Sequence, residues 1–248
     1  MFATVIHSLR RFSAVIAVAA FAVPASAQDE FLAARQRMVA EIEATQREVA
    51  AETGQSRLDR GVLAAMLAVP RHLFVRPQDR DAAYDNRPLP IGHGQTISQP
   101  YIVALMTDLL RVRPGDRIFE LGTGSGYQAA ILARLQADVY SVEIVPPLGA
   151  QAAEALAGAG FAKVHVKVAD GYHGWPEHAP FDAIIVTAAA SHVPPPLIRQ
   201  LKPGGRMVIP VGTGFLTQHL MLVDKAQDGS VTTRQILPVR FVPLVGGH

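Results

Sequence analysis

The most constraining feature of the chain is an alternation of short apolar segments with helix-like segments between residues 117 and 211. Strands are predicted at 117–121, 139–143, 164–168, 181–187 and 206–211, and helices at 127–135, 148–159 and 195–201. Such uniformly apolar strands are typical of a parallel sheet that helices cover on both faces. Two further apolar runs, 219–225 and 231–237, flank Asp228-Gly229, a favourable hairpin turn. We therefore expect a mostly parallel, doubly wound α/β sheet ending in an antiparallel hairpin.

Residues 1–27 have the three parts of a secretory signal peptide. Arg10 and Arg11 precede an apolar run from Phe12 to Val23, and Ala25-Ser26-Ala27 forms an A-x-A cleavage site. The apolar run is shorter than the ~20 residues that a membrane-spanning helix needs. We expect export, to the periplasm, with cleavage near Ala27 and no membrane association of the mature chain. A twin-arginine signal is a weaker alternative, because the residues around the two arginines depart from the usual motif.

Composition excludes several classes of site and partner. The chain has 23 Lys and Arg against 21 Asp and Glu, and the signal segment holds two of the arginines, so the mature chain is balanced at 23 − 2 = 21 against 21. This balance argues against a nucleic-acid partner. The chain has no cysteine, which excludes disulfides, thiolate nucleophiles and Cys-ligated metals. His173, His178 and His192 lack metal-ligand spacing, so we expect no metal site.

The mature chain begins with helical patterns. Residues 29–53 predict an amphipathic helix that ends at Gly54, and residues 58–69 predict a second helix that Pro70 stops. Residues 76–100 are rich in Pro, Gly, Asp and Asn, and a loop this long in a compact domain is usually functional. We expect 28–100 to supply N-terminal helices and a substrate loop, and 101–248 the cofactor-binding core, within one compact domain.

A glycine-rich turn follows the first predicted strand of the core, in the run Glu120-Leu121-Gly122-Thr123-Gly124-Ser125-Gly126. Glycines at a strand-to-helix turn allow positive φ angles and close approach of a ligand. The spacing is G-x-G-x-G, whereas dinucleotide sites have G-x-G-x-x-G. Glu120 adds negative charge, which suits an ammonium or sulfonium better than a pyrophosphate. Ordinary loop chemistry remains the alternative for the turn taken alone.

Acids also end the next two predicted strands. Glu143 stands where a carboxylate can accept both ribose hydroxyls, and Asp170-Gly171 stands where one can accept from an adenine amino group. Three acids at successive strand ends predict an S-adenosylmethionine pocket and resemble the Rossmann-like class I methyltransferases. The expected cofactor-binding residues are Glu120, Gly122, Thr123, Gly124, Gly126, Glu143, Asp170 and Gly171.

Several separated motifs resemble the protein-L-isoaspartate O-methyltransferase family over about 58–246. They are PRHLFV at 70–75, LPIGHGQTISQP at 89–100, ELGTGSGYQ at 120–128, FDAIIVTAA at 181–189 and RFVPLVG at 240–246. The most specific segment, GQTISQP, implies that Ser98 is the active-site serine and that Thr96 and Ile97 bind substrate. Thr187 ends a predicted strand at the carboxyl edge of the sheet, so it could also face the substrate. The RFVPLVG tail could line a peptide groove or form a terminal packing strand.

The resemblance implies an enzyme that transfers methyl from S-adenosylmethionine to the free carboxyl of isoaspartyl and D-aspartyl residues in damaged proteins and peptides. The resulting ester collapses to a succinimide, which hydrolyses partly back to aspartate. A carboxylate is already ionised at neutral pH, so the acceptor needs no general base. We therefore expect Ser98 to orient the carboxylate by a hydrogen bond and to form no covalent intermediate. We also expect a monomer.

Two departures from the family pattern stand out. Residues 45–57 look like an insertion, and Ile144 follows Glu143 where the family commonly has Arg. The export signal also conflicts with the family's typical cytoplasmic location, which is the alternative for this chain. Two rival functions share the expected pocket: a methyltransferase of another carboxylate, and a non-catalytic nucleoside-binding module.

Overall fold

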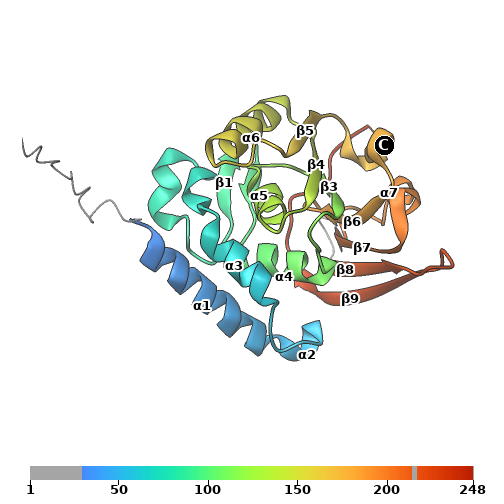
Figure 1. The fold of residues 1–248 in the computed structure, drawn as a ribbon, viewed down its shortest axis with the longest axis horizontal. Helices are drawn as coiled ribbons and strands as arrows, with labels where there is room; N and C mark the ends of the chain where they lie inside the picture. The colour runs from blue at the N-terminus through green and yellow to red at the C-terminus, as the bar shows by residue number, and fades with distance from the viewer. Residues whose placement is uncertain (1–29, 214–216, 248) are drawn as a thin grey trace, which may run out of the picture. The chain divides into compact units, whose positions relative to one another are not determined.

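The computed structural model describes residues 30–213 and 217–247, so the predicted signal peptide at 1–27 lies outside the described residues. Leu32–His248 form one compact unit, whose elements Figure 1 labels. No helix in the described ranges is long and apolar enough to cross a membrane.

The core of this unit is a seven-stranded sheet in the order β5-β4-β3-β6-β7-β8-β9. Its strands are β3 (Arg117–Leu121), β4 (Asp138–Glu143), β5 (His165–Val168), β6 (Phe181–Val186), β7 (Leu201–Val211), β8 (Gln218–Lys225) and β9 (Val231–Val239). The five strands from β5 to β7 are parallel, whereas β8 and β9 each pair antiparallel with the strand before them. The predicted mostly parallel sheet with a terminal antiparallel hairpin is confirmed.

Helices pack against both the sheet and one another. They are α1 (Leu32–Glu48), α2 (Ala50–Thr53), α3 (Arg60–Ala68), α4 (Pro100–Leu110), α5 (Tyr127–Arg134), α6 (Pro146–Gly158) and α7 (Pro195–Gln200). Helix α5 contacts β4, α6 contacts β4 and β5, α4 contacts β6 and β7, and α7 contacts β7. Helices α4, α6 and α7 each begin at a proline, whose fixed φ suits the first helical turn.

The strand order reverses direction beside β3. From β3 the chain moves outward to β4 and β5, then returns to the other side of β3 as β6 and continues to β7. The connections after β3 and β6 therefore leave in opposite directions. This opens a crevice at the carboxyl ends of the two strands, which is where ligands bind in open α/β sheets. The glycine-rich turn follows β3, and Thr187 follows β6, so the topology brings both to this crevice.

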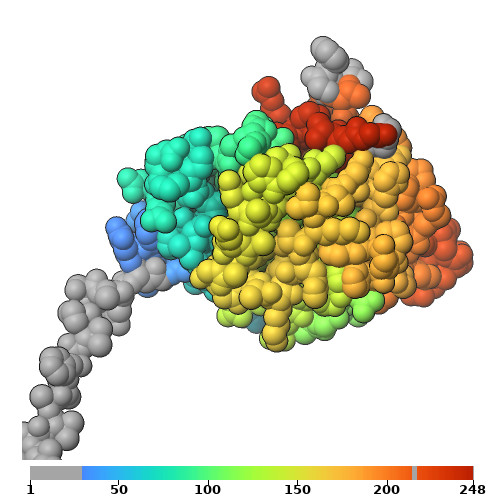
Figure 2. All heavy atoms as spheres, turned by 90° about the horizontal axis from the view of Figure 1, so that it is seen from above, coloured from blue at the N-terminus to red at the C-terminus, as the bar shows by residue number. Residues whose placement is uncertain are grey.

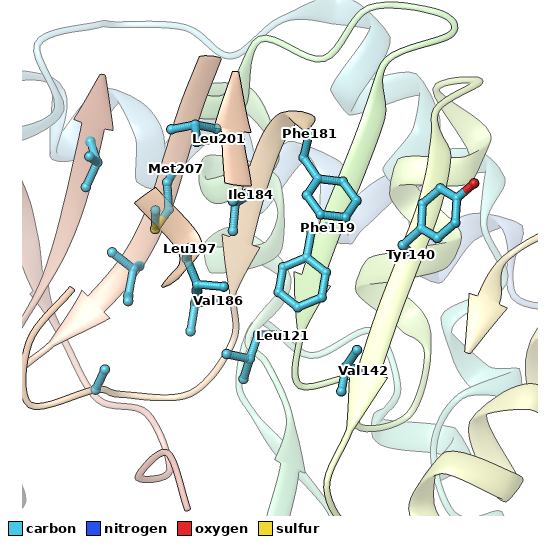
Figure 3. Packing of buried hydrophobic residues seen from close by; sticks show 13 residues of the cluster. Phe119, Leu121, Tyr140, Val142, Phe181, Ile184, Val186, Leu197, Leu201 and Met207 are labelled. Atoms are coloured by element: carbon cyan, nitrogen blue, oxygen red, sulfur yellow. The ribbon is translucent and has the colours of Figure 1, made fainter. Parts of the chain in front are cut away.

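One face of the sheet buries a cluster of large apolar side chains (Figure 3). Phe119 of β3 and Phe181 of β6 lie with ring centroids 5.4 Å apart, and Leu197 of α7 belongs to the same cluster. Neighbouring side chains along a strand point to opposite faces. Phe119 and Leu121 therefore face this cluster, whereas Glu120 between them faces away from it.

The structure differs from the sequence-based prediction in several places. Helix α4 was not predicted, because nine of its eleven residues are buried and its pattern shows no polar face. The predicted irregular segment 76–100 contains a short hairpin, β1 (Leu89–Gly92) paired with β2 (Gln95–Ile97), and the 3-10 turns Arg71–Leu73 and Pro77–Ala82 lie before it. Strand β7 begins at Leu201 and so is longer than predicted.

The segment 45–57 folds against α4. The first predicted helix is broken into α1 and α2 at Val49, and Gln46 donates to Thr53 Oγ1 and to the carbonyl of Gln55. Tyr101 of α4 donates its hydroxyl to Gln46 Oε1 at 3.0 Å. The packing of this segment thus rests on buried polar contacts to α4.

Candidate functional site

A cavity opens at the carboxyl ends of β3, β4 and β6, at the reversal of strand order. The predicted site residues among its lining are Thr96, Ile97, Ser98, Gly122, Thr123, Gly124, Glu143, Gly171 and Thr187. The substrate segment before α4 and the glycine-rich turn after β3 therefore share one cavity, although more than 20 residues separate them in the chain. A concave site at this position is where an α/β fold places its ligand.

The glycine-rich turn is held by main-chain hydrogen bonds on two sides. The amides of Gly122 and Thr123 both donate to the carbonyl of Val142 in β4. On the other side, the Thr187 hydroxyl donates to the carbonyl of Gly122 at 2.6 Å. Thr187 thus joins the ends of β3 and β6, and its single hydroxyl hydrogen is already used by the protein main chain.

Gly126 closes the turn but is not part of the cavity wall. A Cβ at this position would come within 3.0 Å of the Leu156 side chain of α6, and φ is +88°. Its glycine therefore permits close packing of α5 and α6. The predicted contact of Gly126 with the cofactor stays a prediction, and the structure adds a packing reason for this glycine.

Glu143 ends β4 and lines the cavity with only 5% of its surface exposed. Its carboxylate accepts from the amide of Gly124 at 2.8 Å and from the amide of Val145 at 2.9 Å. Two main-chain donors leave further lone pairs on these oxygens, which can accept ribose hydroxyls. The ribose contact stays a prediction, and the geometry adds that Glu143 also shapes the glycine-rich turn.

Glu120, the predicted acid beside the glycine-rich turn, lies deeper in the protein than the other predicted site residues. The side chain is fully buried on the sheet face opposite the apolar cluster, outside the cavity lining. Ser141 donates to Glu120 Oε2 at 2.5 Å, while Oε1 has no hydrogen-bond partner among the described residues. Burial raises the pKa of Glu120 and the nearby Glu143 charge adds to the rise, while the Ser141 hydrogen bond opposes it, so that the pKa is about 8. Glu120 is therefore mostly neutral at pH 7 and lies outside the cavity lining, so its charge does not face the ligand space as expected. Its contact with the cofactor stays a prediction.

Glu120 is connected to the glycine-rich turn through hydroxyl groups. Thr123 Oγ1 lies 2.6 Å from Ser141 Oγ, so a chain of hydroxyls connects the buried acid to the cavity wall. Strand register explains the arrangement, because Glu120 of β3 pairs directly with Ser141 of β4.

Asp170 lies beside the cavity, and its neighbour Gly171 is in the wall. Its carboxylate accepts from the amide of Tyr172, and also from the amide of Gly247 at 3.2 Å. The second bond attaches the C-terminal segment to the end of β5. The predicted adenine contact of Asp170 stays a prediction.

The C-terminal tail, for which two roles remained open, contributes to the cavity wall through Val242, Pro243, Leu244 and Val245. Ala189 holds it in place, donating to the carbonyl of Val242 and accepting from the amide of Leu244. Figure 2 shows the tail, in red, exposed on the surface of this unit.

On the substrate side, Ser98 follows β2 and its side chain is partly exposed in the cavity. The Ser98 hydroxyl forms no hydrogen bond within the described ranges, whereas the Ser98 carbonyl accepts from Arg71 Nη2 at 2.7 Å. Sequence reasoning did not single out Arg71, because a Pro-Arg pair at a helix end carries no signal of a contact 27 residues away. The cavity wall thus holds a hydroxyl without a hydrogen-bond partner among the described residues, together with the glycine-rich turn and the Glu143 carboxylate.

We expect Glu143→Gln to weaken cofactor binding about 10-fold, because a charged acceptor is stronger than a neutral amide and the new NH₂ faces main-chain donors. Calorimetric titration with S-adenosylhomocysteine measures this change. Glu154→Gln, exposed on α6, is the matched control. Equal affinities of Glu143→Gln and the control would remove Glu143 from the cofactor site.

Comparison with known families gives a consistent result. A family model described as Protein-L-isoaspartate(D-aspartate) O-methyltransferase matches residues 44–248. Protein-L-isoaspartate O-methyltransferase 1 of Cupriavidus necator is 61% identical over 237 residues, covering 94% of this chain and 92% of the relative. A protein of the same description from Nitrosospira multiformis is 57% identical over 247 residues, covering 100% of this chain and 98% of the relative.

Solved structures resemble the chain in the same way. A protein-L-isoaspartate O-methyltransferase aligns with a TM-score of 0.73 and 28% identity, covering 86% of this chain and 66% of that one. A Plasmodium falciparum protein described as a beta-aspartate methyltransferase, in complex with S-adenosyl-L-homocysteine, aligns with a TM-score of 0.71 and 25% identity. That alignment covers 85% of this chain and 98% of the other.

Proposed function

The chain belongs to the protein-L-isoaspartate(D-aspartate) O-methyltransferase family, and from this premise we propose how its cavity performs the reaction. The protein is an S-adenosylmethionine-dependent carboxyl methyltransferase that acts on isoaspartyl residues of damaged proteins and peptides. The observation that supports our assignment of roles is the single cavity shared by Ser98 and the glycine-rich turn.

The residues of the cavity fit S-adenosylmethionine. Gly122, Thr123 and Gly124 present main chain close to the ligand space, and Glu143 offers acceptor lone pairs for ribose. Gly171 beside Asp170 completes the rim where an adenine amino group would lie. When bound, S-adenosylmethionine supplies an electrophilic methyl group on a positively charged sulfur.

The acceptor side requires positioning rather than proton transfer. An isoaspartyl carboxylate, with a pKa near ~4, is ionised at neutral pH. The Ser98 hydroxyl has no protein partner in the described residues, so it can donate to one carboxylate oxygen and aim the other toward the methyl group. The tail at 242–245 and Ile97 narrow the cavity with apolar surface, which limits the access of water.

Methylation of matched peptides tests this function. Purified protein is incubated with S-adenosylmethionine labelled in the methyl group and with peptides that differ only in Asp or isoAsp. We expect base-labile label on the isoAsp peptide alone. Equal labelling of both peptides would favour a methyltransferase of another carboxylate, and cofactor binding without labelling would favour a nucleoside-binding module.

Ser98→Ala should lower kcat for the isoaspartyl peptide roughly 10- to 100-fold, the cost of one hydrogen bond to a charged group. The Kd of S-adenosylhomocysteine should stay within a factor of about 2, because its expected contacts lie across the cavity. Initial rates and calorimetry measure the two quantities. Ser230→Ala, in the exposed β8–β9 turn, controls for loss of a serine elsewhere. An unchanged kcat would remove Ser98 from the reaction.

We also propose that the mature protein acts outside the cytoplasm as a monomer, without a nucleic-acid or membrane partner. The signal pattern at 1–27 and the balanced charge of the remainder support this proposal. Fractionation of cells that express the full chain, with N-terminal sequencing, should give a periplasmic protein that starts at Gln28. Light scattering should give the mass of one chain. An uncleaved protein in the cytoplasm would contradict the export proposal.

A further inference from the structure

Arg71 is a fully buried cation in the 3-10 turn that follows α3. Its Nε donates to the carbonyl of Ala83 at 2.8 Å, and its Nη2 donates to the carbonyl of Ser98 at 2.7 Å. Among the described residues it forms no ion pair, and Nη1 has no hydrogen-bond partner. Burial lowers the pKa of Arg71 to about 10, so the guanidinium stays protonated at neutral pH.

The guanidinium carbon Cζ of Arg71 lies over the Tyr127 ring, 4.8 Å from the ring centroid. Tyr127 is the first residue of α5, directly after the glycine-rich turn, and it lines the cavity. Arg71 itself is not part of the cavity wall. It therefore contacts the substrate segment through Ser98 and the cofactor side through Tyr127.

Burying a cation without a carboxylate partner is costly, and main-chain carbonyls compensate only in part. A packed apolar side chain would fill the same volume without that cost. The three contacts explain why an arginine stands here, because its several N–H groups bond two carbonyls while its charge lies over the Tyr127 ring. A lysine ammonium cannot make all three contacts at once.

We propose that Arg71 is a positioning residue for methyl transfer, which holds the main chain of Ser98 at a fixed place relative to the start of α5. This role rests on the proposed function of Ser98. Arg71 sets the direction of the Ser98 hydroxyl, and through it the direction of the acceptor carboxylate. It touches neither substrate nor cofactor.

The test is a double-mutant cycle between Arg71→Lys and Ser98→Ala. In the presence of Ser98, Arg71→Lys should lower kcat/KM for the isoaspartyl peptide roughly 10- to 100-fold, as expected for a misplaced contact group. In the Ser98→Ala background the same change should cost less than about 3-fold, because the group that it positions is gone. A general packing role would cost the same factor in both backgrounds.

Two controls separate this role from loss of structure. Arg35→Lys alters another buried arginine that donates to a main-chain carbonyl, that of Ala68, and it should leave kcat/KM within about 3-fold. The Kd of S-adenosylhomocysteine should likewise change by less than about 3-fold in Arg71→Lys. A parallel loss of cofactor affinity and activity would overturn the proposal.

Arg71→Met repeats the cycle without burying an ammonium, and the same non-additivity is expected. Thermal unfolding measures whether the Arg71 variants fold. If neither Arg71→Lys nor Arg71→Met folds, the proposal is overturned, and Arg71 has a packing role instead. If the wild type is active and Arg71→Lys has the same kcat/KM, the positioning role of Arg71 is refuted but the proposed function is not. A wild type that methylates no isoaspartyl peptide would instead refute the proposed function, and this role with it.

Discussion

Gly122→Ala should destabilise the folded protein by roughly 2–5 kcal/mol, from backbone strain and overpacking together. Gly122 has φ +96°, which an alanine adopts only with strain. Its new Cβ would also collide with Thr187 Oγ1, the hydroxyl that joins β3 to β6. The Thr187 hydroxyl is itself held by the carbonyls of Leu121 and Gly122, so it can move away only by losing these hydrogen bonds. Urea unfolding followed by circular dichroism measures the loss.

Gly124→Ala is the matched control in the same turn. Its φ is +54°, inside the left-handed region, and the nearest neighbour of a new Cβ would be Ile91 Cδ1 at an ordinary 3.5 Å. It should cost only about 1 kcal/mol of unfolding free energy. Equal losses for the two variants would show that positive φ alone, and not contact with Thr187, requires Gly122.

The parallel sheet was predictable because its strands are short apolar runs separated by helices with clear boundaries. The one long element that escaped prediction, α4, is buried on nearly all sides, so its sequence has no period of polar residues to reveal it. The β1–β2 hairpin escaped for a different reason. Its strands have only four and three residues, and their pairing depends on the surrounding loop.

The sequence predicted which residues line the cavity where this depends on their position at a strand end. It did not predict residues whose place depends on the direction of the side chain. Gly122, Glu143 and Thr187 follow from lying at strand ends, because parallel strands share one carboxyl edge. Glu120 lies two residues before Gly122, within β3, and alternation turns its side chain to the sheet face opposite Phe119 and Leu121. Arg71 could not be found at all, since its contacts with Ser98 and Tyr127 exist only after the chain has folded.

The buried Glu120 should make stability depend on pH. Its pKa is raised from 4.5 to about 8 in the folded protein, so the folded state binds a proton that the unfolded state releases. Its contribution is fully present below about pH 4.5 and declines by roughly 1.4 kcal/mol for each pH unit up to about pH 8. Urea unfolding at pH 5, 6, 7 and 8 measures the decline.

Glu120→Gln isolates this group, because the amide is neutral at every pH and nearly the same shape. The free energy of unfolding of Glu120→Gln, minus that of the wild type, should therefore rise with pH. Glu154→Gln, on the exposed face of α6, is the control for the loss of one carboxylate. A constant difference across this range would show that Glu120 is ionised when buried.

The same variant decides whether Glu120 acts on the ligand. A carboxylate that faced the sulfonium would bind S-adenosylmethionine better than the uncharged thioether of S-adenosylhomocysteine, and Glu120→Gln would remove that preference. A neutral acid joined to Thr123 only through Ser141 predicts an unchanged ratio of the two affinities at pH 7. We expect the unchanged ratio, because Glu120 is mostly neutral at pH 7 and lies outside the cavity wall.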